Sequence, residues 1–146
     1  KMKLSAKLPK NLVMTPHPGE ASRLLGKSID EIESNRFEAV SLLQRKFNCV
    51  VVLKGSGSLV CYSKGGKQQI GICEAGNPGM ASGGMGDILT GIIAGFLAQG
   101  LSLIEATELG VDIHAKAADL KSLETGEAGL LASDVLEELR QLLKYE

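Results

Sequence analysis

The sequence predicts an α/β protein, and two stretches carry most of that prediction. The run Cys49–Leu53 (CVVVL) is apolar and rich in β-branched residues, which is typical of a strand covered on both faces. The stretch Ala75–Leu101 joins a loop of Gly, Asn, Pro and Ser to an apolar run that carries no charge after Asp87. This second pattern predicts a tight loop that leads into a buried helix. A buried strand that alternates with helices indicates a sheet with helices packed on it.

The rest of the chain divides into short strands and helices that Gly, Pro and capping residues separate. We expect a basic lead-in over residues 1–10, strands over 12–15, 59–63 and 68–73, a hairpin turn over 64–67, and helices over 19–25, 28–47, 87–99, 102–123 and 134–144. Ser28 with Glu31, and Ser102 with Glu105, have the spacing of capping boxes, and Ser133 is expected to cap the last helix.

The composition limits the classes of partner that this chain could bind. Its 146 residues carry a formal net charge of -1, and aromatic residues make up 3% with no Trp. These values argue against nucleic acid or an anionic membrane surface as a partner. The apolar run over residues 88–98 is too short to span a bilayer. Because Cys49, Cys61 and Cys73 are odd in number and form no CxxC pair, we interpret them as buried reduced thiols and expect a cytoplasmic protein.

The segment Gly83-Gly84-Met85-Gly86-Asp87 is the strongest chemical signal in the chain. A helix start has unpaired N–H groups and favours an anion, and glycines let a ligand approach the backbone closely. We therefore predict an anion hole at Gly84, Met85 and Gly86. A carboxylate there would repel a phosphate unless its task is to accept a proton, and this makes Asp87 a candidate general base. The alternative is a flexible loop in which Asp87 only caps the helix.

Two further loops follow strand candidates, which is where α/β folds bind ligands. Residues 15–20 (TPHPGE) carry His17 and Glu20, although a rigid proline turn with a solvated histidine explains this loop equally well. Lys54–Ser58 (KGSGS) places a lysine among small residues, which suits a nucleotide phosphate or ribose. A Gly/Ser turn between two strands would look the same. His114 has no partner at metal-ligand spacing, and we interpret it as structural.

Four segments together resemble the ADP-dependent (S)-NAD(P)H-hydrate dehydratase family of the ribokinase-like superfamily. They are TPHPGEASRLLG, VVLKGSGSLV, GNPGMASGGMGDILTGIIAGFLAQG and GEAGLLASDVL, and they follow the family's order. The resemblance runs from about Met14 to Leu143, which is nearly the whole chain. It implies a ribokinase-like fold with a mostly parallel sheet flanked by helices. The family usually reads KGAGT where this chain has KGSGS, a departure that keeps small residues and backbone donors.

The resemblance implies a lyase that repairs metabolites by dehydrating hydrated NADH or NADPH, driven by ADP or ATP with Mg²⁺. By likeness, substrate contacts fall on His17 and Asp87. Nucleotide contacts fall on Gly86 and on Lys54, Gly55, Ser56, Gly57 and Ser58. Glu20 would help to hold Mg²⁺ through water, as the glutamate of the similar TPNxxE stretch does in related vitamin kinases. Asp87 would take the proton from the ring hydroxyl of the hydrate, which then attacks the terminal phosphoryl group.

The same resemblance implies that residues 1–146 form a single partial domain, the C-terminal half of a ribokinase-like fold. We therefore expect the chain to pair with an N-terminal segment, with further copies of itself in a homo-oligomer such as a tetramer, or with both. Two other functions stay open. One is a vitamin or sugar kinase of the same superfamily, and the other is a non-catalytic nucleotide-binding fragment. The loop GNPGMASGGMGD and the HPGE motif favour the dehydratase.

Overall fold

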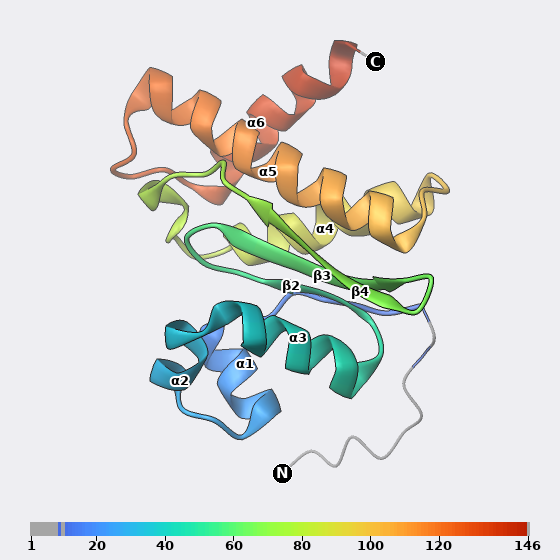
Figure 1. Cartoon of the computed structure of the whole chain (residues 1–146). Helices are drawn as coiled ribbons and strands as arrows, with labels where there is room; N and C mark the ends of the chain where they lie inside the picture. The colour runs from blue at the N-terminus through green and yellow to red at the C-terminus, as the bar shows by residue number, and fades with distance from the viewer. Residues whose placement is uncertain (1–8, 10, 146) are drawn as a thin grey trace.

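The computed structural model describes residue 9 and residues 11 to 145, and the described chain has the predicted α/β class (Figure 1). One sheet contains its strands in the order β1 (Val13–Met14), β2 (Val50–Leu53), β3 (Ser58–Lys64) and β4 (Lys67–Cys73). β1 is parallel to β2, whereas the pairings of β2 with β3 and of β3 with β4 are antiparallel. These four strands therefore form a mixed sheet rather than a mostly parallel one, because the chain reverses direction both at residues 54–57 and at the expected hairpin turn over 64–67. The lead-in expected over residues 1–10 falls, apart from residue 9, outside the described residues.

Helices cover both faces of this sheet (Figure 1). One face carries α1 (Pro18–Leu25), α2 (Ile29–Ser34) and α3 (Arg36–Phe47), and the other carries α4 (Met85–Ala98) and α5 (Leu103–Thr125). α6 (Ala132–Leu142) packs on α4 and α5, away from the sheet. Two short 3₁₀ helices, η1 (Pro78–Met80) and η2 (Leu143–Tyr145), precede α4 and follow α6.

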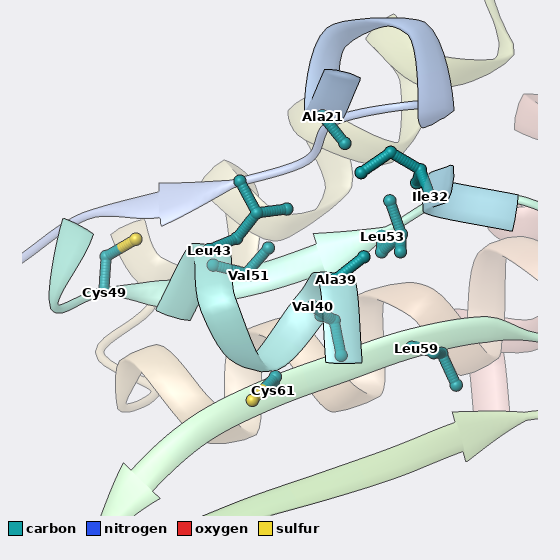
Figure 2. Close-up of a cluster of buried hydrophobic side chains, with 10 residues drawn as sticks. All are labelled: Ala21, Ile32, Ala39, Val40, Leu43, Cys49, Val51, Leu53, Leu59 and Cys61. Atoms are coloured by element: carbon teal, nitrogen blue, oxygen red, sulfur yellow. The ribbon is translucent and has the colours of Figure 1, made fainter. Parts of the chain in front are cut away.

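Strand β2 is central to the core because all four of its residues are buried. Successive side chains of a strand point to opposite faces of the sheet. Val51 and Leu53 accordingly pack with residues of α1, α2, α3 and β3 in one cluster, which Figure 2 shows. Val50 and Val52 point the other way and pack with residues of α4 and α5. This double coverage confirms the expectation of a strand buried on both faces.

The helix expected over residues 28–47 is interrupted at Asn35. The Asn35 side chain accepts a hydrogen bond from the Glu38 N–H group (3.1 Å), so it starts α3 as an N-cap. The expectation of one continuous helix was wrong because the apolar spacing continues through the break. The capping box of Ser28 with Glu31, by contrast, is present at the start of α2.

Two helix starts also differ from the sequence-based prediction. α4 begins at Met85 rather than at Asp87, with Gly84 as its N-cap. α6 is not capped by Ser133, because the Asp134 carboxylate accepts a hydrogen bond from the Leu131 N–H group (2.8 Å). The start of α5, with its capping box of Ser102 and Glu105, and the hairpin turn over residues 64–67 are as predicted.

The cysteines have the properties of buried reduced thiols. All three are free, with Cys49 and Cys61 buried and Cys73 partly buried. Burial raises the pKa of the Cys49 and Cys61 thiols to about 11, so both stay protonated at neutral pH. Protonated thiols are poor nucleophiles, and these two act as small apolar side chains of the core.

His114 is a buried histidine of α5 that lies next to the Met85 backbone at the start of α4. It is 6% exposed, and its Nε2 atom has no hydrogen-bond partner among the described residues. Burial lowers the pKa of His114 to about 4, and the neighbouring Met85 backbone opposes this shift only in part. A neutral, packed imidazole agrees with the structural interpretation of this residue.

We predict that His114 makes the fold less stable in acid. Its pKa of about 4 in the folded state lies below the value of about 6.5 of an exposed histidine, so the unfolded chain takes up the proton first. The free energy of unfolding should therefore fall between pH 6.5 and pH 4, by up to about 1.4 kcal/mol per pH unit from this group. Urea unfolding of the wild type and of His114→Gln at several pH values measures this dependence of the unfolding free energy on pH.

The His114→Gln variant should show a shallower acid slope, while the slopes of the two proteins agree between pH 7 and pH 8. Equal slopes below pH 6.5 would contradict the prediction.

Candidate active site at the start of α4

Four segments that are distant in sequence meet at one end of the sheet: the end of β1, the start of α1, the loop after β2 and the start of α4. Lys54 Nζ, at the end of β2, lies 3.9 Å from Glu20 Oε2 of α1. A Cβ atom added to Gly86 would lie 2.8 Å from the same Nζ, so the lysine reaches the backbone of α4. The Thr15 and Thr90 hydroxyls, from β1's end and α4, are 3.3 Å apart. The three sequence motifs are thus neighbours in space.

His17 and Glu20 hold the start of α1 together. His17 Nδ1 accepts hydrogen bonds from the N–H groups of Gly19 (3.0 Å) and Glu20 (3.3 Å), and Glu20 Oε2 accepts one from the His17 N–H group (2.7 Å). The His17 ring is half exposed, and its Nε2 atom lies 3.6 Å from Glu20 Oε2. The proline turn therefore fixes both side chains and leaves the outer edge of the imidazole facing solvent.

The start of α4 has the form of an anion-binding helix terminus. Gly84 is its N-cap with φ of 89°, a left-handed conformation that favours glycine. The first intrahelical bonds run from the N–H groups of Asp87 and Ile88 to the Gly84 carbonyl oxygen, both 3.0 Å. The N–H groups of Met85 and Gly86 precede these bonds and are left to a ligand or water. Asp87 is exposed in the first turn. The alternative in which Asp87 only caps the helix is wrong, because Gly84 takes the N-cap position.

The glycine loop before α4 is tied to α5. The Asp119 carboxylate accepts hydrogen bonds from the Gly76 N–H group and from the Asn77 side-chain amide, both 2.8 Å. The Asn77 side-chain oxygen in turn accepts the Gly79 N–H group (3.1 Å) at the start of η1. These bonds fix the first half of the loop, which argues against a purely flexible linker.

The loop Lys54–Ser58 is a turn between β2 and β3 that a distant arginine holds. Arg36, the first residue of α3, donates hydrogen bonds to the carbonyl oxygens of Leu53 (3.3 Å) and Ser56. Of the five loop residues, Lys54 is the one whose side chain reaches α4. Gly55, Ser56 and Gly57 form the turn behind it, and Ser58 begins β3.

Three residues at the site, Thr90, Arg36 and Asp119, were not identified from the sequence. Thr90 shares an exposed helix face with Asp87, three residues earlier, and its hydroxyl also donates to the Gly86 carbonyl oxygen (2.9 Å). That spacing could have identified it. Arg36 and Asp119 act over separations of 20 and 43 residues, respectively, and no local pattern indicates such contacts.

We also searched the rest of the described surface for a metal site, a membrane-spanning helix or a hollow that could bind a phosphate. Within the described residues, no group of three or more His, Cys, Asp or Glu side chains could hold a metal ion, and none of the helices there is long and apolar enough to cross a membrane. A hollow of about 710 Å³ lies between the end of α4 and α5. Glu105, Glu108 and Asp112 line it, so its charge would repel a phosphate.

Residues 1–141 match the sequence profile of the NAD(P)H-hydrate dehydratase family. The chain belongs to this family. It is 54% identical over 131 residues to the bifunctional NAD(P)H-hydrate repair enzyme Nnr of Vibrio cholerae, a match that covers 90% of this chain and 26% of that protein. It is 42% identical to the ADP-dependent (S)-NAD(P)H-hydrate dehydratase of Neisseria meningitidis, covering 91% of this chain and 44% of that protein.

The solved structures agree with the sequence matches. The ADP/ATP-dependent NAD(P)H-hydrate dehydratase of Bacillus subtilis, co-crystallised with ATP and Mg²⁺, superposes with a TM-score of 0.85 at 30% identity. The match covers 92% of this chain and 47% of that one. The ribokinase-like fold expected from the resemblance is thus confirmed, and the chain spans about a quarter to a half of the length of these relatives.

We predict that Gly84 and Gly83 respond differently to alanine. At Gly84 an alanine must adopt a positive φ, and its Cβ would lie 3.2 Å from that of Ala132. The cost should be about 1–2 kcal/mol in the free energy of unfolding. Gly83→Ala is the matched control, because a Cβ there meets nothing within 4 Å and its φ is not positive. Denaturant unfolding of both variants measures the difference, and equal losses would contradict the geometry.

Proposed function

We propose that this chain provides the phosphoryl-transfer site of a nucleotide-dependent NAD(P)H-hydrate dehydratase, a metabolite-repair lyase. The observation that carries the proposal is that Lys54 Nζ reaches the Gly86 backbone at the start of α4. The next residue of that helix, Asp87, is exposed. A cation, unpaired helix N–H groups and a proton acceptor then share one site. Family membership and the names of the relatives support the substrate assignment.

The nucleotide is proposed to be ADP or ATP, with its terminal phosphate at the N–H groups of Met85 and Gly86. Preorganised N–H donors at a helix start stabilise charge that develops on a transferring group. Lys54 supplies a positive charge next to them, and the backbone of the turn Gly55–Ser58 would contact the rest of the nucleotide. The ATP of the Bacillus subtilis crystals supports this choice of ligand.

Mg²⁺ is proposed to accompany the nucleotide, as in those crystals. The ion would neutralise phosphate charge while it keeps most of its own water ligands. The partly exposed Glu20 carboxylate faces Lys54, and the described residues contain no cluster of three or more metal-ligating side chains, so the site fits an ion bound chiefly by phosphates and water. Glu20 would hold it through water rather than directly.

In the proposed reaction Asp87 accepts the proton of the ring hydroxyl of the hydrate, and His17 contacts the substrate. The hydroxyl oxygen forms a bond to the terminal phosphorus while the bond between that phosphorus and the bridging oxygen of the nucleotide breaks. The C–O bond of the phosphorylated ring then breaks while the neighbouring ring carbon loses a proton to water, and this elimination releases phosphate and restores the double bond of the nicotinamide ring. The N–H groups at Gly84–Gly86 hold the charge of the phosphoryl group during transfer.

The whole protein is proposed to need residues beyond this partial domain. The face of α4 that carries Thr90, Gly91, Ala94 and Gly95 is exposed, and a Cβ added to either glycine meets nothing within 4 Å. Small residues on a helix let another element pack closely, so an N-terminal segment of the longer fold or a second copy of the chain would cover this face. Analytical ultracentrifugation of the whole protein tests for the homo-oligomer, for which a tetramer is our expectation.

The cellular location is proposed to be the cytoplasm, with NAD(P)H-hydrate and the nucleotide as the binding partners. The free thiols Cys49, Cys61 and Cys73 support a reducing compartment.

The function is tested by adding ADP and Mg²⁺ to hydrated NADH with the whole protein and following absorbance and nucleotide consumption together. A dehydratase consumes nucleotide and restores the absorbance of the reduced nicotinamide in equal amounts. A kinase would consume nucleotide without that rise. If neither change occurs, the chain is a nucleotide-binding fragment without this activity, and the proposal is overturned.

We predict that Asp87→Asn lowers kcat by at least about 10²-fold, because it removes a general base of similar size. ADP affinity should stay largely unchanged, since the N–H groups and Lys54 remain. Asp30→Asn is the control, as Asp30 lies in the first turn of α2 and is exposed. For each variant, steady-state kinetics measures kcat and calorimetry measures the affinity for ADP. Near-normal turnover of Asp87→Asn would remove this residue from the role of base.

A further inference from the structure

Arg36 contacts the turn after β2 at two points that flank Lys54 and Gly55. From the first turn of α3 its guanidinium donates to the Leu53 carbonyl oxygen (3.3 Å) and to the Ser56 carbonyl oxygen. An arginine fork that binds two carbonyl groups fixes both their separation and their direction. The two residues between them, Lys54 and Gly55, are therefore held in one conformation.

The backbone of Gly55 lies directly against the Arg36 guanidinium. Its φ is 148°, and a Cβ atom at this position would lie 2.8 Å from Arg36 Nη2 and 3.1 Å from Cζ. The guanidinium thus fills the space that a side chain would take. Because the chain at Gly55 lies directly against Arg36, loss of the guanidinium would leave a gap behind the turn.

The position of Lys54 depends on this turn. Its own N–H group donates to the Pro16 carbonyl oxygen (2.9 Å), which fixes the residue on the β1 side. On the other side the chain continues into the turn that Arg36 holds. Arg36 Nε is buried and has no hydrogen-bond partner among the described residues, a cost that the fold bears while the two outer nitrogens bind carbonyl groups.

We propose that Arg36 is the positioning residue of the nucleotide loop: from α3 its guanidinium holds the Leu53 and Ser56 carbonyl groups, so that Lys54 and the backbone of Gly55 face the nucleotide. The proposal rests on the function proposed above for the Lys54–Ser58 loop. Arg36 touches neither the reacting atoms nor Asp87 in this scheme. It acts through the loop, and its loss should weaken nucleotide binding rather than slow the chemistry.

The test is Arg36→Met in the whole protein, assayed with ADP, Mg²⁺ and hydrated NADH. Methionine keeps much of the apolar stem but removes every donor. The KM for ADP should rise about tenfold or more, the effect expected when hydrogen bonds from a charged donor are lost. The kcat at saturating ADP and the KM for the hydrate should stay close to wild type. Arg45→Gln, an exposed arginine in the last turn of the same helix, is the matched control.

A merely structural arginine would change thermal stability without this split between KM and kcat. Arg36→Lys separates charge from geometry, because lysine keeps the charge but cannot span two carbonyl groups with a rigid fork. It should restore little of the ADP affinity. If Arg36→Met does not fold, Arg36→Lys gives the same measurement with a smaller perturbation.

The outcomes distinguish this inference from the function on which it rests. Wild-type protein that binds ADP and dehydrates the hydrate, together with unchanged ADP KM values in the folded Arg36 variants, would overturn the inference alone. Full rescue by Arg36→Lys would show that charge is sufficient and would overturn the positioning role. Wild-type protein that fails to bind ADP would overturn the proposed function and this inference together.

Discussion

Burial of β2 on both faces is the constraint on which the other features of this structure depend. Val51 and Leu53 belong to the hydrophobic cluster between the sheet and α1–α3. Val50 and Val52 belong to the cluster between the sheet and the helices α4 and α5. Helices on opposite faces are thus fixed relative to the same four residues. The strand ends at Leu53 and Lys54 follows it directly, so this residue emerges where α1 and α4 both reach the same end of the sheet. A substitution that reduced the packing of either cluster would therefore change how α1 and α4 are placed relative to each other.

At this end of the sheet the fold holds a lysine, a carboxylate and the first N–H groups of a helix close together. Side chains on an open surface would be held in such an arrangement only weakly. Lys54 Nζ lies between the Glu20 carboxylate and the α4 backbone. The first N–H groups of α4 add the positive end of a 14-residue helix. Asp87 is the exception, an acid where an anion is expected to bind. That conflict is reasonable for a base that acts on a substrate hydroxyl next to a phosphate, and it would be costly for a site that only binds nucleotide.

The sequence was sufficient to predict the features that depend on neighbouring residues. The apolar run at β2, the glycine hairpin turn and the capping boxes at Ser28 and Ser102 each follow from local chemistry, and all are present. The start of α4 was expected at Asp87 and lies at Met85, because Gly84 and Asp87 both belong to the residue types that cap helices and the sequence does not choose between them. The break at Asn35 was missed because the apolar spacing is the same on both sides of it.

Contacts between distant segments could not be predicted in the same way. Arg36 with Ser56, and Asp119 with Gly76, depend on how helices are placed on the sheet, and a single sequence holds no pattern for that placement. The motifs at His17, Lys54 and Gly86 were expected to act together because of a family resemblance, and their proximity is a property of the fold. Local chemistry and the resemblance thus supplied the candidate residues, and the packing around β2 determines how close they lie.

If the proposed site is right, the N–H groups at the start of α4 and the loop after β2 bind one nucleotide. A titration of the ¹⁵N-labelled whole protein with ADP and Mg²⁺, followed by amide chemical shifts, tests this. We expect the amides of Met85, Gly86 and Asp87 and those of Lys54–Ser58 to shift together, with the same dissociation constant. Saturable ADP binding that leaves these two groups of amides unmoved would contradict it.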